Sequence, residues 1–163
     1  MVRLWAIMRM LFLLTLANGA PVVAKKIFGD RLSRALDNGA RYLDGQPLFG
    51  ASKTIRGIIF SVLVTVVGGY LLGLRGKTGA LIGSVAMSGD VFSSFLKRRM
   101  RLPVSSRAIG LDQIPESLFP LLACRRALAL TVSDIAVAVI TFLISELLIS
   151  RVLYKFRLRD RPY

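Results

Sequence analysis

The sequence predicts an all-α integral membrane protein, with five transmembrane helices and a polar cytoplasmic loop between the first helix and the second. Hydrophobic residues make up 54% of the 163 residues, and the mean hydropathy is +0.60. Long uncharged runs alternate with basic clusters, a pattern typical of membrane proteins. Lys and Arg number 23 against 9 Asp and Glu, a formal net charge of +14, and most of these cations fall between alternate helices.

The first three helices are expected at residues 4–24, 57–74 and 78–96. The second is the clearest, because its 18 residues carry no charge. At about 1.5 Å per residue they nearly match a bilayer core of about 30 Å. The first helix is expected to be irregular at Asn18-Gly-Ala-Pro21, because proline removes a backbone donor.

The fifth helix is expected at residues 127–150, and a short fourth helix is expected just before it. The uncharged core of the fourth, Ile114–Cys124, has only 11 residues, so it spans only if the helix begins near Asp112 and ends near Ala127. Five crossings place three basic clusters on one side, which the positive-inside rule makes cytoplasmic, with the amino terminus outside and the carboxyl terminus inside. The clusters are Lys25, Lys26, Arg31, Arg34, Arg41, Lys53 and Arg56; Lys97, Arg98, Arg99, Arg101 and Arg107; and Arg151, Lys155, Arg157, Arg159 and Arg161.

The whole chain, residues 1–163, is expected to form one membrane-embedded domain. The loop from Lys25 to Arg56 is too short and too poor in apolar residues to build its own core. Chemistry is therefore expected at the membrane interface. No aromatic residues are interleaved with the basic clusters, which argues against nucleic acid. The single Cys124 argues against an internal disulfide or a cysteine metal cluster.

Acidic residues inside a membrane are costly and often functional, so Asp90 and Asp112 are the first candidates. Each is expected at the cytoplasmic end of a helix, where the pair suits Mg²⁺, an ion that prefers oxygen ligands and accompanies nucleotide phosphates. Asp90, Ser94 and Lys97 stand at i, i+4 and i+7 and so share one helix face. Asp112 fits a helix cap equally well, and the basic run after Lys97, taken alone, favours a topological role.

The other acidic residues of the helices are not assigned to the candidate site. Asp134 is expected toward the outer half of the fifth helix, where we predict an interhelical hydrogen bond. Glu146 is expected near the inner interface and is placed outside the site. Glu116 lies one turn beyond Asp112 and is assigned no role.

The segment Gly45-Gln-Pro-Leu-Phe-Gly50-Ala-Ser-Lys53-Thr54 has a superficial likeness to a phosphate-binding loop. Two extra residues separate Gly50 from Lys53, and no strand is predicted before it, so it is not that motif. A glycine-bearing backbone followed by Lys53 and Arg56 still suits phosphate near a helix start. A plain amphipathic entry into the second helix has equal support.

Four segments, taken in order on this helical frame, resemble the archaeal CDP-archaeol synthase family, which is distantly related to the CDP-diacylglycerol synthases. They are Asn18-Gly-Ala-Pro21, Phe49-Gly-Ala-Ser-Lys-Thr-Ile-Arg-Gly57, Gly89-Asp-Val-Phe-Ser-Ser-Phe-Leu-Lys-Arg-Arg99 and Gly110-Leu-Asp-Gln-Ile-Pro-Glu116. The resemblance implies Mg²⁺-dependent transfer of CMP from CTP to 2,3-bis-O-geranylgeranyl-glycerol 1-phosphate, giving the unsaturated CDP-archaeol and pyrophosphate. A lipid phosphate attacks in such a reaction, so no protein nucleophile is needed.

The resemblance assigns roles to four residues: Asp90 and Asp112 as metal-binding and catalytic residues, Lys97 as a catalytic and phosphate-binding residue, and Arg98 as a phosphate ligand. Lys53 and Arg56 are added as phosphate ligands, with Ser94 and Asn18 as further substrate contacts. The expected partners are CTP, an isoprenoid glycerol phosphate lipid, the cell membrane and, as an open alternative to a monomer, a second copy of the chain. Two rival functions remain. A small transporter for an anionic solute needs a continuous polar path, and a lipid-binding scaffold leaves the aspartates unexplained.

Overall fold

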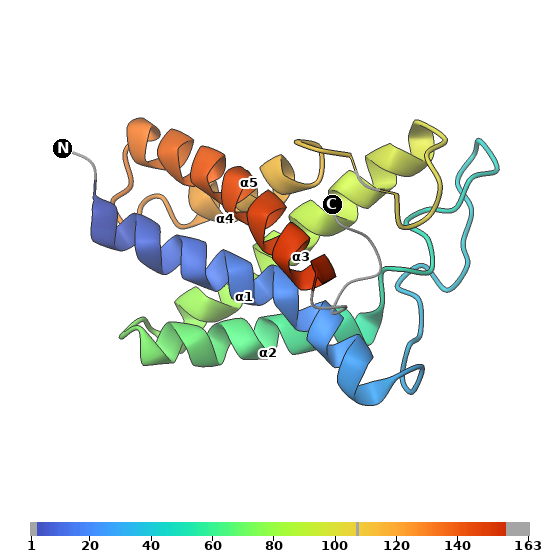
Figure 1. Cartoon of the computed structure of the whole chain (residues 1–163), viewed down its shortest axis with the longest axis horizontal. Helices are drawn as coiled ribbons and strands as arrows, with labels where there is room; N and C mark the ends of the chain where they lie inside the picture. Colours follow the sequence, from blue (N-terminus) through green and yellow to red (C-terminus); the bar gives the residue numbers. More distant parts are fainter. Residues whose placement is uncertain (1–2, 107, 156–163) are drawn as a thin grey trace.

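The computed structural model describes residues 3–106 and 108–155, and in these ranges the chain forms five α-helices and no β-strand (Figure 1). The central helix α3 packs against α1, α2 and α4, and α5 packs against α1 and α4. Arg107 and the tail residues Arg157, Arg159 and Arg161 lie outside the described residues. The helices are α1 Leu4–Phe28, α2 Ile55–Leu71, α3 Gly76–Arg99, α4 Gln113–Ala123 and α5 Val132–Lys155.

Three of these helices, α1, α3 and α5, are long and apolar enough to cross a membrane. The apolar helix α2 has 17 residues, and α4 has 11, which correspond to about 16 Å. The prediction that the fourth helix reaches Ala127 is wrong. The helix stops at Ala123 because the chain turns after Cys124, with Ala129 in the left-handed region, to reach the start of α5.

The helix directions place the basic clusters toward one end of the bundle. The Arg3 N–H, just before α1, donates to Asp134 Oδ1 at 2.9 Å, so α1 and α5 begin side by side. The loop between α1 and α2 and the connection between α3 and α4 lie at the opposite end (Figure 1). The predicted interhelical bond of Asp134 is confirmed. Its Oδ2 also accepts the Thr131 N–H, while Thr131 Oγ1 accepts the Asp134 N–H, so the two residues cap α5 reciprocally.

The expected irregularity at Asn18–Pro21 does not occur, because α1 continues as an α-helix through Pro21 to Phe28. Proline has no N–H, so the carbonyl of Ala17, four residues earlier, lacks its partner within the helix. The Ser61 hydroxyl of α2 donates to this carbonyl at 2.8 Å. A side chain of the neighbouring helix thus satisfies the backbone group that the proline leaves free.

Ser61→Ala is expected to lower the free energy of unfolding by roughly 1 to 2 kcal/mol, because it leaves the buried Ala17 carbonyl without a donor. In a Pro21→Ala background the helix supplies its own N–H, and the same substitution should cost much less. Chemical unfolding of the four proteins in detergent measures the difference. Ser88→Ala is the matched control, since the exposed Ser88 hydroxyl bonds only to a carbonyl of its own helix. If Ser61→Ala lowers the free energy of unfolding equally in both backgrounds, the Ser61 hydroxyl does not compensate for the missing N–H of Pro21.

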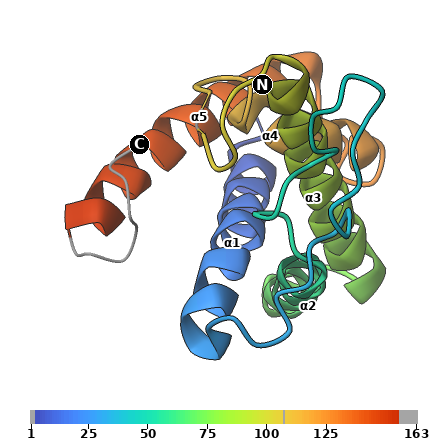
Figure 2. The same ribbon diagram turned by 90° about the vertical axis from the view of Figure 1, so that its right-hand side faces the viewer.

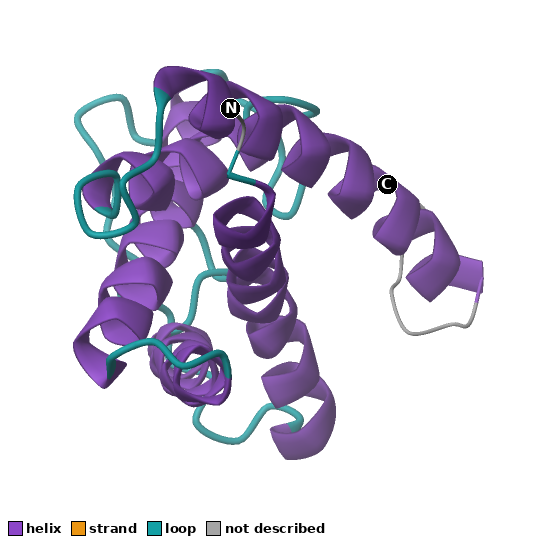
Figure 3. Cartoon of the chain, turned by 90° about the vertical axis from the view of Figure 1, so that its left-hand side faces the viewer, coloured by secondary structure: helices purple, strands orange, loops and turns teal. Residues whose placement is uncertain are grey.

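Small residues permit close packing of α2 against α3. A Cβ on Gly79 would lie 2.9 Å from both the Thr65 carbonyl oxygen and the Val66 Cα, so only glycine allows the two backbones to approach this far. Figures 2 and 3 show the carboxyl-terminal half of α5 diverging from the rest of the bundle. The outward faces of α2 and α5 are apolar and exposed, as lipid-facing surfaces are.

Candidate active site

A polar cavity of about 520 Å³ lies at the basic end of the bundle, among α1, α3, α4, α5 and the segment before α2. It collects residues that are far apart in the sequence. Of the residues that the sequence singled out, it brings together Asn18, Lys53, Asp90, Ser94, Lys97, Arg98 and Asp112. Their convergence supports a single site, and their individual roles stay predictions.

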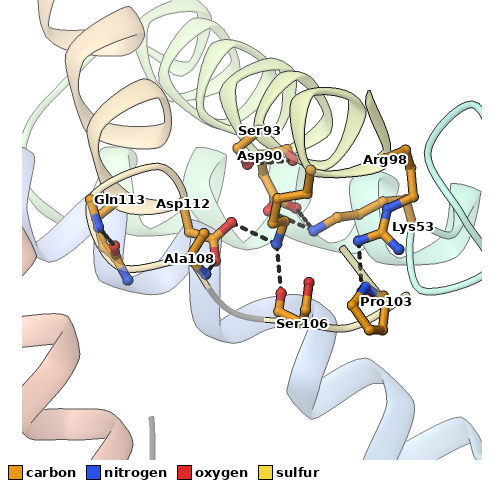
Figure 4. A network of polar contacts seen from close by, with 11 residues as sticks. Lys53, Asp90, Ser93, Arg98, Pro103, Ser106, Ala108, Asp112 and Gln113 are labelled. Atoms are coloured by element: carbon orange, nitrogen blue, oxygen red, sulfur yellow. Dashed lines mark hydrogen bonds and ion pairs between the residues drawn. The ribbon is translucent and has the colours of Figure 1, made fainter. Parts of the chain in front are cut away.

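Two ion pairs cross this cavity (Figure 4). Lys53, from the loop before α2, places its Nζ 2.5 Å from Asp90 Oδ2 on α3. Lys97, near the end of α3, places its Nζ 2.7 Å from Asp112 Oδ1 and also donates to the Ser106 carbonyl at 2.8 Å. Each candidate aspartate therefore faces one of the candidate lysines.

Asp112 stands at the amino-terminal cap position of α4, as the helix-cap interpretation has it, but its side chain makes no capping bond to the helix. Its Oδ2 instead accepts the Ala108 N–H at 3.0 Å, outside the helix, while Oδ1 pairs with Lys97. Arg98 lines the same cavity and donates through Nη2 to the Pro103 carbonyl at 2.8 Å (Figure 4). The segment between α3 and α4 thus holds both basic side chains at the cavity wall.

Arg56 is not among the residues that line the cavity, although the sequence analysis proposed it as a phosphate ligand. Its Nη1 donates to the carbonyls of Gly29 and Arg31, and its guanidinium lies over the Phe28 ring. Arg56 is on the first turn of α2, two residues after the capping residue Thr54. From there its side chain holds the chain segment that follows α1.

Asp37 organises the loop that carries Lys53. Its carboxylate accepts backbone N–H bonds from Gly39, Phe49 and Gly50 at 2.8 to 3.1 Å. Burial works to raise the pKa of Asp37, but these donors hold that pKa below its usual value. The Gly50 N–H is therefore engaged with Asp37 rather than free to cradle phosphate, and Lys53 is the part of the glycine-containing segment that reaches the cavity.

Several cavity residues were missed by the sequence analysis. Lys25 and Lys26 were assigned to a loop, but α1 continues through them and turns them toward the site. Glu146, which we had placed outside the site, lines the cavity, as do Gln113 and Glu116. The spacing of Asp112, Gln113 and Glu116 on one turn was the available signal for the last two.

Gly89 brings α4 against α3 beside the ion pairs. A Cβ there would overlap the Pro115 carbonyl oxygen and lie 2.8 Å from the Glu116 Cα. The adjacent residue Asp90 carries one of the ion pairs. The glycine therefore sets the distance between the carboxylates of α3 and α4.

Gly89→Ala is expected to push α4 away from α3, because the added methyl meets backbone atoms that cannot rotate aside. Overpacking of this kind costs roughly 1 to 3 kcal/mol of unfolding free energy. Thermal unfolding of the purified variant measures this cost. Gly76→Ala is the matched control, since its Cβ meets nothing within 4 Å. If both substitutions lower the free energy of unfolding equally, Gly89 is not a position of close contact between α3 and α4.

The cavity residues fit a magnesium ion. The described residues hold no group of three or more His, Cys, Asp or Glu placed to bind a metal. Magnesium at nucleotide sites, however, is usually held by one or two carboxylates together with substrate phosphates and water. Asp90 and Asp112 line one cavity and supply such carboxylates.

A second cavity, of about 510 Å³, lies between α2 and α3, where Leu36 and Phe49 of the loop between α1 and α2 also line it. None of its lining residues is charged, and it shares only Met87 with the polar cavity. The charged side chains that line these two cavities therefore all belong to the first.

Comparison with known proteins agrees with this site. The family model for CarS-like CDP-archaeol synthases matches residues 1–163. A CDP-archaeol synthase of Pyrobaculum calidifontis is 30% identical over 152 residues, covering 90% of each chain. One from Thermofilum pendens is 31% identical over 153 residues, covering 90% of this chain and 75% of the relative.

A solved structure described as an intramembrane enzyme for archaeal membrane lipids biosynthesis matches the fold with a TM-score of 0.69 and 28% identity. It covers 83% of this chain and 89% of its own. This likeness and the three long apolar helices make the protein a multi-pass membrane protein. Because the family match extends over the whole sequence, the chain belongs to the CDP-archaeol synthase family.

Proposed function

We propose that this protein transfers CMP from CTP to an archaeal isoprenoid glycerol phosphate, forming the unsaturated CDP-archaeol and pyrophosphate. The observation that carries the proposal is one cavity at the basic end of an apolar helical bundle, where five cations meet two aspartates that are each paired with a lysine. Those residues are Asp90, Asp112, Lys25, Lys26, Lys53, Lys97 and Arg98. A site for a triphosphate and a lipid phosphate needs such a concentration of cations.

In the proposed reaction, an oxygen of the lipid phosphate attacks the α-phosphorus of CTP. The new O–P bond forms as the bond from the α-phosphorus to the bridging oxygen breaks, and that electron pair leaves with pyrophosphate. The attacking oxygen is already ionised at neutral pH, so no general base is required. In this proposal Lys97 and Arg98 neutralise charge on the phosphates, and their contacts to the Ser106 and Pro103 carbonyls, which hold them in the cavity wall, support that role.

Asp90 and Asp112 would hold Mg²⁺ together with the triphosphate. Bound there, the ion would supply neutralisation of the phosphate charge. Lys53 and Lys97, which pair with these carboxylates, would contact the phosphate oxygens. The two ion pairs keep the aspartates compensated before substrate binds.

We also propose that the cavity faces the cytoplasm. The basic residues at its end support this orientation through the positive-inside rule. Single cysteines introduced at Tyr163 and Arg126 in a Cys124→Ser background should show opposite accessibility in intact cells. An impermeant reagent should label only the cysteine at position 126. Labelling of the tail cysteine would overturn the orientation without affecting the chemistry.

Incorporation of radiolabelled CTP into lipid by the purified protein tests the activity. A labelled CDP-lipid should form with Mg²⁺ and an ether-linked isoprenoid glycerol phosphate, and less of it with ester-linked phosphatidate. The rival function of a transporter finds no support, because the cavity's cations come from the end of α1, the segment before α2 and the end of α3, which is one end of the bundle. Failure to form labelled lipid, together with failure to bind CTP, would refute the proposed function.

A further inference from the structure

Two residues on the first turn of α4, Gln113 and Glu116, are unexplained by the proposed reaction. They stand at i and i+3, so their side chains leave the helix on the same side. Both line the polar cavity, and both are buried, with 6% and 3% exposure respectively. Buried polar groups at a cavity wall are expected to have hydrogen-bond partners.

The amide of Gln113 has a fixed orientation. The Gly110 N–H lies 2.8 Å from Gln113 Oε1. A backbone N–H forms a hydrogen bond only with an acceptor, so the amide oxygen of Gln113 must face Gly110 and its NH₂ group must point the other way. Within the described part of the chain, the structure records no acceptor for this NH₂, which leaves a fixed donor at the cavity wall.

Glu116 supplies the complementary group. Its Oε1 is buried and has no hydrogen-bond partner among the described residues. The close contact between Gly89 and the backbone of Pro115 and Glu116 fixes the base of this side chain against α3. One turn of α4 thus presents a donor and an acceptor on the same side of the helix.

The cations of the cavity come from other elements. Lys25 and Lys26 lie on α1, Lys53 lies before α2, and Lys97 and Arg98 lie on α3. No cavity residue of α4 is cationic. A triphosphate held by these cations, with Mg²⁺ at Asp90 and Asp112, leaves Gln113 and Glu116 of α4 for the uncharged part of the nucleotide.

We propose that Gln113 and Glu116 select the cytosine base, an inference that rests on the proposed use of CTP. Gln113 Nε2–H donates to cytosine N3, and Glu116 Oε1 accepts from the cytosine 4-amino group. Uracil presents the opposite pattern, with N3–H as a donor and O4 as an acceptor, so both contacts would become repulsive. A site built this way rejects UTP because two buried polar groups would be left unpaired.

The test compares kcat/KM for CTP, UTP and 3-deaza-CTP, in which N3 is replaced by a C–H group. The wild-type protein should prefer CTP to both analogues. Gln113→Leu should lower kcat/KM for CTP by roughly 10- to 100-fold and should abolish the discrimination against 3-deaza-CTP. Glu116→Gln, whose amide is able to donate to O4, should reduce the preference for CTP over UTP by a similar factor.

Gln113→Glu is the second variant, because it keeps the acceptor for Gly110 while replacing the NH₂ donor by an oxygen. It should shift preference toward UTP, and it remains informative if Gln113→Leu does not fold. Gln46→Glu, in the loop outside the cavity, is the matched control and should leave the CTP to UTP ratio unchanged.

The outcomes separate this inference from the proposed function. If the wild-type protein transfers no nucleotide to lipid, the proposed function itself fails. If it transfers CMP but the Gln113 and Glu116 variants keep the wild-type ratio of CTP to UTP, only the assignment of base selection is wrong. A raised Mg²⁺ requirement in Glu116→Gln, with unchanged base preference, would likewise overturn it and identify a metal ligand.

Discussion

Replacing Asp90 or Asp112 by Asn is expected to lower turnover by roughly 10³-fold, a loss comparable to removing a principal electrostatic group from an active site. Asparagine keeps the volume of the side chain but loses the negative charge that a hard divalent cation requires. Both carboxylates line the same cavity, and the Asp112 side chain makes no capping bond to α4. Steady-state turnover with purified protein measures the effect.

A binding measurement separates the metal role from a structural one. Titration with Mn²⁺ in the presence of CTP should show weaker metal binding in Asp90→Asn and Asp112→Asn. Each variant also leaves Lys53 or Lys97 without its partner, so thermal unfolding is measured alongside. Near wild-type turnover with unchanged metal dependence would exclude the altered residue as an essential ligand.

Asp134→Asn is the matched control, because Asp134 lies at the opposite end of the bundle beside Arg3. Both of its oxygens accept hydrogen bonds, and an amide is able to replace only one of them. The substitution should therefore cost about 1 kcal/mol of stability while leaving turnover intact. A loss of turnover equal to that of Asp90→Asn would show that the aspartate effect is not specific to the cavity.

Removing the charge of Lys53 or Lys97 is expected to reduce kcat/KM for CTP or for the lipid by roughly 10²-fold, because each charge is proposed to contact phosphate. The helices should survive the change. Lys53→Ala and Lys97→Ala are compared with Lys53→Arg and Lys97→Arg, which retain the charge and should recover part of the activity. Arg56→Ala provides a contrast, since its guanidinium binds the Gly29 and Arg31 carbonyls outside the cavity.

Lys97 needs a second variant because it is buried and paired with Asp112. Losing one partner of a buried pair leaves the other charge uncompensated. The double variant Lys97→Met/Asp112→Asn removes both charges, so it separates destabilisation from loss of phosphate binding. If both single alanine variants show unchanged kinetics, Lys53 and Lys97 act only as markers of membrane topology.

The sequence by itself determined the helical membrane architecture, because long uncharged runs and basic clusters are local properties of the chain. It also placed Asp90, Ser94 and Lys97 on one face of α3, since helix geometry repeats over a few residues. The family followed from ordered motifs. The length of α4 did not follow, because its end depends on the turn that reaches Thr131 rather than on hydropathy.

Only the tertiary structure decided which charged groups share the cavity. Lys53 and Asp90 are 37 residues apart in the sequence, and their pairing depends on how the loop before α2 folds around Asp37. The same loop directs Arg56 away from the site. Glu116 comes beside the carboxylate of α3 because Gly89 lets two backbones touch. Contacts of this kind arise between distant segments, so no local sequence pattern specifies them.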